Sequence, residues 1–180
     1  MIVGLNESVQ FLIKILTKFK QYLELKEIQL EIVNTYYNHP YLEKFSTNIS
    51  NLIVLKSESF EGLTPRNLGG RNLFKTSNEF RLRFSLYFLS FPFLKTYRDS
   101  YEAVCKVYEH FLEFLHENRF RFEFRKELES DSYLLLTYYI YSISNLNNDG
   151  LLGVSNRRSN MCFSFNQIFI ANIQALEQER

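Results

Sequence analysis

The clearest alternation of hydrophobic and polar positions runs through EFRLRFSLYFLSF, residues 79–91. One set of alternate positions holds phenylalanine and leucine: Phe80, Leu82, Phe84, Leu86 and Phe88. The positions between them hold arginine, serine and tyrosine: Arg81, Arg83, Ser85 and Tyr87. A period of two is typical of a β-strand that buries one face and leaves the other in water. The pattern therefore predicts a half-buried strand.

Five further segments also have strand-like patterns. EIQLEIV (27–33) and RFRFEFR (119–125) alternate in the same way, and the second is expected to direct its phenylalanines inward. NLIVLKSES (51–59) opens with a continuous apolar run, and YLLLTYYIYSI (133–143) is apolar on both faces, which indicates more deeply buried strands. A closing strand is predicted over residues 160–171.

Two segments follow a helical period instead. An N-terminal helix is predicted over residues 7–25, where apolar residues recur at three- and four-residue steps after a cap at Asn6 or Ser8. A second helix is predicted after Asp99, which can cap it together with Glu102. The apolar stripe of this second helix is expected to contain Tyr101, Val104, Cys105, Tyr108, Phe111, Leu112 and Leu115.

The order of these elements indicates the fold class. Residues 60–78 break the periodicity with three glycines and a proline, so an irregular loop is predicted there. Only one helix interrupts the strands, and parallel neighbours need crossover connections, so the sheet cannot be mostly parallel. We therefore predict a single α+β domain over residues 1–180, in which an antiparallel-dominated β-sheet carries two packed α-helices.

Composition limits the function classes. The 180 residues include 18 Phe and 12 Tyr, and the formal net charge is +1, which gives no overall field that would attract nucleic acid or an anionic membrane. No apolar run approaches the roughly 20 residues that span a bilayer, and the N-terminus lacks a signal-peptide pattern. Cys105 and Cys162 lie in apolar segments and are interpreted as buried thiols of a reducing compartment. A cytoplasmic location without membrane contact is expected.

The sequence contains little that resembles a catalytic, metal or cofactor site. The three histidines form no metal-binding motif, and the two cysteines lack the short spacing of a zinc site. The stretch from Asn145 to Gly150 resembles the start of a calcium loop, but Asn156 occupies the position of the bidentate glutamate. A turn made by Asn, Asp and Gly is the simpler interpretation. We expect no enzyme, no cofactor and no metal.

Arginines on predicted strand faces raise the question of nucleic-acid binding. Arg81 and Arg83 share one face, and three more arginines of residues 119–125 share another. Sheets that bind RNA stack bases on exposed aromatic rings, whereas here most aromatic residues occupy the opposite, core-facing positions. Tyr87 is the one candidate stacking ring, so nucleic acid is disfavoured relative to solubility or a protein contact.

Four stretches resemble a known family, the tail terminator (cap) proteins of phage-tail-like contractile injection systems. They are NLIVLKSES, EFRLRFSLYFLSF, YRDSYEAVCKVYEHFLEFL and NLNNDGLLGVSNRRSNMCFSFNQIFI. The first is similar to a hydrophobic strand with an acidic end, and the second to the family's long alternating strand. The third is similar to its helix with aromatics near both ends, and the fourth to its Asn-rich turn, Leu-Gly and final strand.

The resemblance implies a structural assembly protein of a contractile tail or injection particle. Such a protein caps the end of the tail tube and sheath as a homo-oligomeric ring, generally a hexamer, without catalytic residues. A closed ring needs a heterologous interface, and exposed strand edges or loops can accept a neighbouring strand. Alternatives are an adaptor or baseplate-type component of the same machine, and a nucleic-acid-binding domain.

The resemblance directs attention to two loops as partner interfaces. The stretch from Ser142 to Asn160 is then a joint and interface loop. The residues expected to contact partners in the two loops are Arg66, Arg71, Asn148, Asp149, Arg157 and Arg158. The final residues, NIQALEQER, are a further interface candidate. Glutamate at both 157 and 158 is expected to weaken ring assembly while the monomer stays folded.

Overall fold

The computed structural model describes residues 5–34, 51–63, 78–90, 97–128, 132–153 and 161–179, and these contain two helices and seven strands. The helices are α1 (Leu5–Glu24) and α3 (Tyr97–Glu117). The strands are β1 (Glu31–Asn34), β2 (Asn51–Leu63), β3 (Asn78–Ser90), β4 (Arg121–Glu127), β5 (Ser132–Ile143), β6 (Asn147–Gly153) and β7 (Met161–Glu179).

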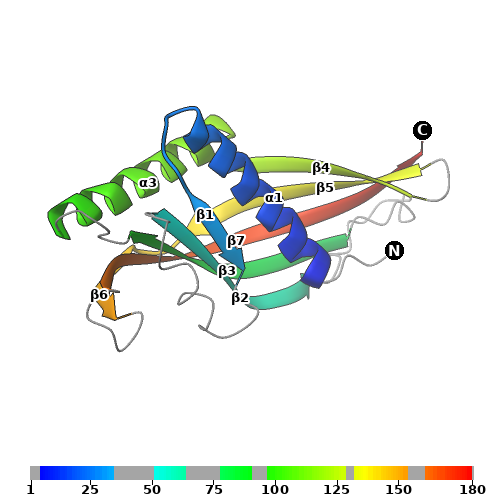
Figure 1. The fold of residues 1–180 in the computed structure, drawn as a ribbon. Coiled ribbons are helices and arrows are strands. Elements are labelled where there is room, and N and C mark those ends of the chain that lie inside the picture. Colours follow the sequence, from blue (N-terminus) through cyan, green and yellow to red (C-terminus); the bar gives the residue numbers. More distant parts are fainter. Residues whose placement is uncertain are drawn as a thin grey trace.

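All seven strands belong to one sheet, in the order β1-β2-β3-β7-β5-β4, and β6 pairs with β7 beside the end of β5. Only β1 and β2 are parallel, while the other five pairings are antiparallel. The predicted α+β class with an antiparallel-dominated sheet and two packed helices is confirmed. The last strand, β7, lies at the centre of the sheet and joins β1-β2-β3 to β5-β4, so the sheet is complete only when this C-terminal segment is in place (Figure 1).

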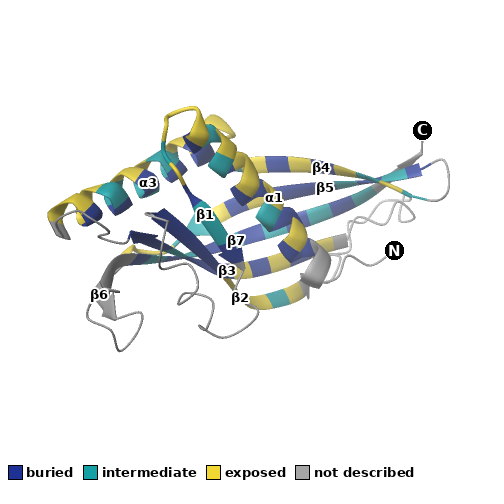
Figure 2. Cartoon of the chain, viewed as in Figure 1, coloured by how far each residue is buried: buried dark blue, intermediate teal, exposed yellow. Residues whose placement is uncertain are grey.

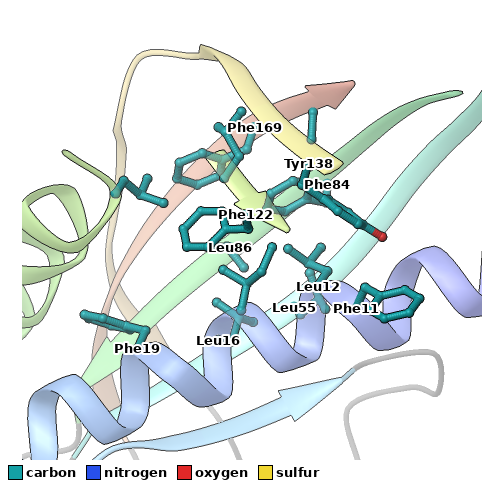
Figure 3. Packing of buried hydrophobic residues seen from close by; sticks show 14 of the residues in the cluster. Phe11, Leu12, Leu16, Phe19, Leu55, Phe84, Leu86, Phe122, Tyr138 and Phe169 are labelled. Atoms are coloured by element: carbon teal, nitrogen blue, oxygen red, sulfur yellow. The ribbon is translucent and has the colours of Figure 1, made fainter. Parts of the chain in front are cut away.

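Both helices cover the same face of the sheet (Figure 1). Their apolar stripes and the inward positions of the strands form one core cluster, part of which is drawn in Figure 3. The aromatic residues determine its geometry. Phe84 of β3 stacks on Phe169 of β7 with ring centroids 5.4 Å apart, and Phe111 of α3 meets Phe169 edge-on at 5.7 Å. Tyr138 is fully buried and donates a hydrogen bond to the Ser8 carbonyl oxygen at 2.5 Å, which links α1 to β5.

Each helix ends in the same hydrogen-bonded turn. After α1, Ile28 N–H donates to Leu23 O and Glu27 N–H donates to Glu24 O, both at 3.0 Å. After α3, Phe120 N–H donates to Leu115 O at 2.8 Å. This pattern is the Schellman motif, which needs a left-handed residue just past the helix.

Here that residue is not glycine. Glu27 has φ 59° after α1, and Arg119 has φ 53° after α3. Phe120 also has a positive φ, so the expected strand from 119 begins only at Arg121.

A β-bulge keeps β2 in phase with the core. Ser57 pairs with Phe84 and Ser59 pairs with Arg83, so Glu58 is an extra residue in the strand. Strict alternation from Ser57 would direct Phe60 away from the helices. The extra residue brings Phe60 to the inner face, where it stacks on Phe80 at 5.2 Å.

Several predicted boundaries differ from the structure. The N-terminal helix, predicted at 7–25, runs from Leu5 to Glu24. Residues 60–63 of the predicted loop 60–78 belong to β2, and 64–77 lie outside the described residues. The closing strand, predicted at 160–171, is β7 and continues to Glu179 because β3 and β5 flank its second half. Among the described residues, no helix is long and apolar enough to cross a membrane.

Candidate interaction surface

The face of the sheet opposite α1 and α3 is the candidate surface, and we call it the helix-free face. The register places on it the residues that alternate with the core positions. On β3 these include Arg81, Arg83 and Tyr87, which fall opposite Asn172, Ile170 and Asn166 of β7. On β5 they include Tyr133, Leu135, Thr137 and Tyr139, which fall opposite Gln178, Leu176, Gln174 and Asn172 of β7. On β4 they are Arg121, Glu123, Arg125 and Glu127.

The two ends of this face differ in exposure (Figure 2). Near β1, four apolar residues of the face are buried although they lie outside the main core cluster: Val33, Leu52, Val54 and Leu89. On β4 every second residue is exposed, and on β5 the rings of Tyr139 and Tyr141 are 38% and 51% exposed. The most exposed tyrosines of the helix-free face therefore lie at its β4–β5 end, while charged residues such as Arg81 and Arg83 are also exposed on β3.

Arginine and tyrosine side chains stack on each other across β4 and β5. The Arg125 guanidinium lies 3.9 Å from the centre of the Tyr133 ring, and that of Arg121 lies 5.3 Å from the Tyr139 ring. A guanidinium over an aromatic face is attracted by the ring's electron density and contributes about 0.5–1 kcal/mol when exposed. The two contacts align four long side chains along one end of the sheet.

The charges on this face neutralise each other. Arg125 Nε lies 2.9 Å from Glu127 Oε1, and Arg121 forms an ion pair with Glu123. On β2 and β3, Arg83 Nε donates to Glu58 Oε2 at 2.7 Å, and Ser85 donates to the other oxygen of this carboxylate. The bulge in β2 places Glu58 for both contacts, because the extra residue lies on the helix-free face.

The most exposed large apolar residues of this end follow one another along the chain. Tyr139 and Tyr141 belong to β5, and Leu146 (36% exposed) lies between β5 and β6. Tyr141 is the extra residue of a second bulge, since Ile140 pairs with Ala171 and Ser142 pairs with Ile170. Tyrosine and arginine are enriched at protein–protein interfaces, where lysine and glutamate are depleted.

Only two of the predicted contact residues fall within the described part of the chain. Asn148 and Asp149 lie in β6, a strand that the sequence analysis did not anticipate, and Asp149 is the extra residue between Asn148 and Gly150. The predicted joint and interface loop Ser142–Asn160 is therefore partly β-strand, and its role as an interface stays a prediction. Residues 142–143 complete β5 and 147–153 pair with β7, which supplies hydrogen-bond partners for their backbone.

The other predicted contact residues, Arg66, Arg71, Arg157 and Arg158, lie outside the described residues. The final segment, by contrast, is described as part of β7 up to Glu179. Its residues 172–179 pair with residues 132–139 of β5, so the backbone of most of NIQALEQER forms hydrogen bonds within the sheet.

The tyrosines of β5 were missed as surface rings. Tyr87 was the single predicted candidate for stacking, but the helix-free face also carries Tyr133 and Tyr139 of β5. The signal was present as a period of two from Tyr133 through Thr137 to Tyr139. This period could not indicate which side is exposed, because apolar residues occupy both faces of this strand.

The described groups with shifted pKa values lie on the helices or, for Lys26, in the turn after α1, away from this face. Burial raises the pKa of the Cys105 thiol, while a hydrogen bond with Tyr101 partly offsets that increase. A hydrogen bond from His110 Nδ1 at 2.7 Å lowers the pKa of the Glu113 carboxyl, and Lys26 adds to this effect. Within the described ranges, no three His, Cys, Asp or Glu side chains gather as they would around a metal ion.

Residues 1–179 match the family described as "Borrelia burgdorferi protein of unknown function (DUF764)". No curated protein matches the chain with significant similarity.

Proposed function

The chain belongs to the DUF764 family, whose description gives no function, and we propose that it is a structural assembly protein that caps a contractile tail or injection particle. In this proposal, several copies form a ring on the last subunits of the tail tube and sheath and end their polymerisation. The sequence resemblance to tail terminator proteins suggests this role. The observation that carries it in the structure is the exposed tyrosine and arginine end of the helix-free face.

The chemistry of this face favours a protein partner. Its exposed rings supply apolar area with few rotatable bonds, so binding costs little conformational entropy. Three of its arginines, Arg83, Arg121 and Arg125, are already paired with carboxylates of the same face. A protein surface with donors and acceptors can add to such pairs, whereas a phosphate backbone would have to compete with the carboxylates.

The balance of charge argues in the same direction. The basic residues of the helix-free face in β2, β3 and β4 are Lys56, Arg81, Arg83, Arg121 and Arg125. The acidic ones are Glu58, Glu61, Glu79, Glu123 and Glu127. Five positive and five negative charges leave no net field for nucleic acid. An adaptor or baseplate-type role in the same machine would use the same surface and remains the alternative proposal.

The test compares the exposed tyrosines of this face with an exposed leucine away from it. Serine replaces both Tyr139 and Tyr141 in one variant, and Leu25, which is 88% exposed beyond the end of α1, in the other. Tagged copies are purified from the native host, and co-purifying tube and sheath subunits are quantified by mass spectrometry. Circular dichroism checks that each variant is folded.

The double tyrosine variant is expected to recover at least about tenfold less of the tube and sheath subunits, because buried aromatic anchors carry most of an interface's energy. Leu25→Ser is expected to recover as much as the wild type. Equal recovery by the two variants would contradict the proposed surface. Recovery of no tube or sheath subunit by the wild type would contradict the proposed function itself.

A further inference from the structure

The last strand at one end of the sheet, β4, has a sequence that is complementary to itself. Its positions on the helix-free face are Arg121, Glu123, Arg125 and Glu127, so positive and negative charges alternate along the strand. All four side chains are about half exposed, between 47% and 54%. β4 pairs with β5 on one side, and no described strand pairs with its other side.

The backbone groups of these four residues point away from β5. Leu128 N–H donates to Ser132 O at 3.1 Å, and Phe120 O accepts from Ile140 N–H at 3.0 Å. Hydrogen bonds on one side of a strand come from every second residue. The even-numbered residues therefore face β5, while the N–H and C=O groups of Arg121, Glu123, Arg125 and Glu127 face outward.

We propose that β4 is the docking edge for a second copy of this chain, which pairs antiparallel about a twofold axis at Phe124. In this register Arg121 meets Glu127 of the second copy, and Glu123 meets Arg125 of the second copy. The outward backbone groups of the same residues fall opposite each other and form about eight hydrogen bonds. The two sheets join into one continuous sheet.

The alternating charges select this register. Moving one copy by two residues in either direction places Glu123 opposite Glu123, or Arg125 opposite Arg125, on the axis. Moving it by one residue sets the helix-free face of one strand against the core face of the other. Like charges directly opposite each other destabilise a strand pair, so only the register centred on Phe124 satisfies all four positions.

Such a contact also explains why the edge has alternating signs. Exposed edges are commonly protected by charged side chains, especially lysine, and charges of one sign would repel every copy. The charges of the two arginines and two glutamates sum to zero, so this edge does not repel a second copy of the chain. The contact is isologous and closes on itself, so it does not depend on the ring proposed above, which needs a heterologous contact.

Two permutations of the four charges separate contacts between copies from contacts within one chain. E123R/R125E changes the order to Arg-Arg-Glu-Glu, which breaks both ion pairs within β4 but keeps every opposite-charge pair across the axis. R121E/E123R changes the order to Glu-Arg-Arg-Glu, which keeps a pair within each half of β4 but sets like charges opposite each other throughout. Composition and net charge are the same in all three proteins, and each variant moves one arginine off its tyrosine.

Sedimentation equilibrium of the purified proteins, without tube or sheath, measures the dimer from micromolar to millimolar concentrations. The wild type and E123R/R125E are expected to dimerise with constants within about threefold of each other. R121E/E123R is expected to associate roughly a hundredfold more weakly, at about threefold for each of four cross-strand pairs. A monomeric wild type, or equal association by R121E/E123R, would overturn the proposal.

Mixing of single variants gives a second test that does not depend on a permuted strand. E123R alone and R125E alone each place like charges at two of the four cross-strand pairs, so each is expected to associate about tenfold more weakly than the wild type. Mixed in equal amounts, they set two arginines of the E123R strand, at positions 123 and 125, opposite two glutamates of the R125E strand and should form a heterodimer. A mixture that associates no more strongly than each variant alone would overturn the register. Loss of tail particles in the host would bear only on the proposed function.

Discussion

Replacement of Phe169 by alanine should be among the most destabilising single changes in the described part of the chain. Phe169 lies in β7, the central strand, and its side chain is fully buried. Its ring stacks on that of Phe84 in β3, with ring centroids 5.4 Å apart; both rings are labelled in Figure 3. It also meets the Phe111 ring of α3 edge-on, with ring centroids 5.7 Å apart. The residue therefore joins the sheet to one of the helices that cover it.

The expected cost is about 4 kcal/mol. Phe→Ala changes in cores cost about 3–5 kcal/mol, and the upper half of this range applies because two favourable ring contacts are lost. Total stability of a domain is about 5–15 kcal/mol, so the variant should fold but unfold early. With a urea slope of about 2 kcal/mol/M, the unfolding midpoint should fall by about 2 M.

Urea unfolding followed by circular dichroism measures this difference. Phe60→Ala is the matched control, because Phe60 also stacks on one ring, Phe80, but is only partly buried at the end of β2. The control should cost about 1–2 kcal/mol. Phe169→Leu, which keeps most of the volume, should cost less than about 1.5 kcal/mol. A loss for Phe169→Ala no larger than that for Phe60→Ala would refute the packing argument.

Other predictions concern single groups. Tyr138→Phe should cost about 1–2 kcal/mol in urea unfolding, because it removes the buried hydroxyl's hydrogen bond. Arg119→Gly should raise the free energy of unfolding by about 0.5–1 kcal/mol, because glycine adopts the left-handed conformation of this position without steric strain. An unchanged melting temperature would contradict this. Because the pKa of Glu113 is lowered in the folded protein, its ionised carboxylate stabilises the fold at any pH above the ordinary pKa of glutamate. This stabilisation is lost as the pH falls through the lowered pKa of the folded state. His110→Gln should move this pKa upward in an NMR titration, and an unmoved titration would exclude the contact in solution. Burial raises the pKa of Cys105, so iodoacetamide should alkylate it more slowly than free cysteine near pH 8, as read from peptide masses.

The sequence was sufficient to predict the parts of the fold in which one pattern dominates. The inward positions of β3 are those predicted from alternation, and all five are buried. In α1 the predicted stripe likewise faces the sheet, as Leu16 and Phe19 do. Both elements pack one face against the core and leave the other in water, so periodicity alone indicates their orientation.

The second helix was predicted correctly as an element but with its buried stripe rotated. Tyr101 was placed in the core and is 42% exposed, whereas Val107 and Phe114, which were not predicted, are buried. The helix is rich in aromatic residues on several sides, so periodicity could not select one face. It also begins at Tyr97, and Glu102 accepts a hydrogen bond from Arg98 at 2.8 Å instead of completing the expected cap.

The candidate surface could be predicted only in part. The exposed arginines of β3 and β4 followed from alternation, but the pairing of Arg83 with Glu58 depends on the register of β2 and β3. Glu58 reaches Arg83 because of a bulge, and the bulge follows from the requirement that Phe60 face the core. β6 was read as a turn because its Asn, Asp and Gly residues disfavour strands, yet the edge of β7 provides a ladder that overrides this preference.

The location of the protein on an assembled particle tests the central proposal most directly. A tagged copy purified from the native host can be labelled with gold and imaged by negative-stain electron microscopy. Striated rods labelled at one end only, or six-lobed labelled rings, are the result expected of a tail cap. Label along the whole rod, or labelled protein without rods or rings, would contradict the cap and leave the adaptor as the proposal to pursue.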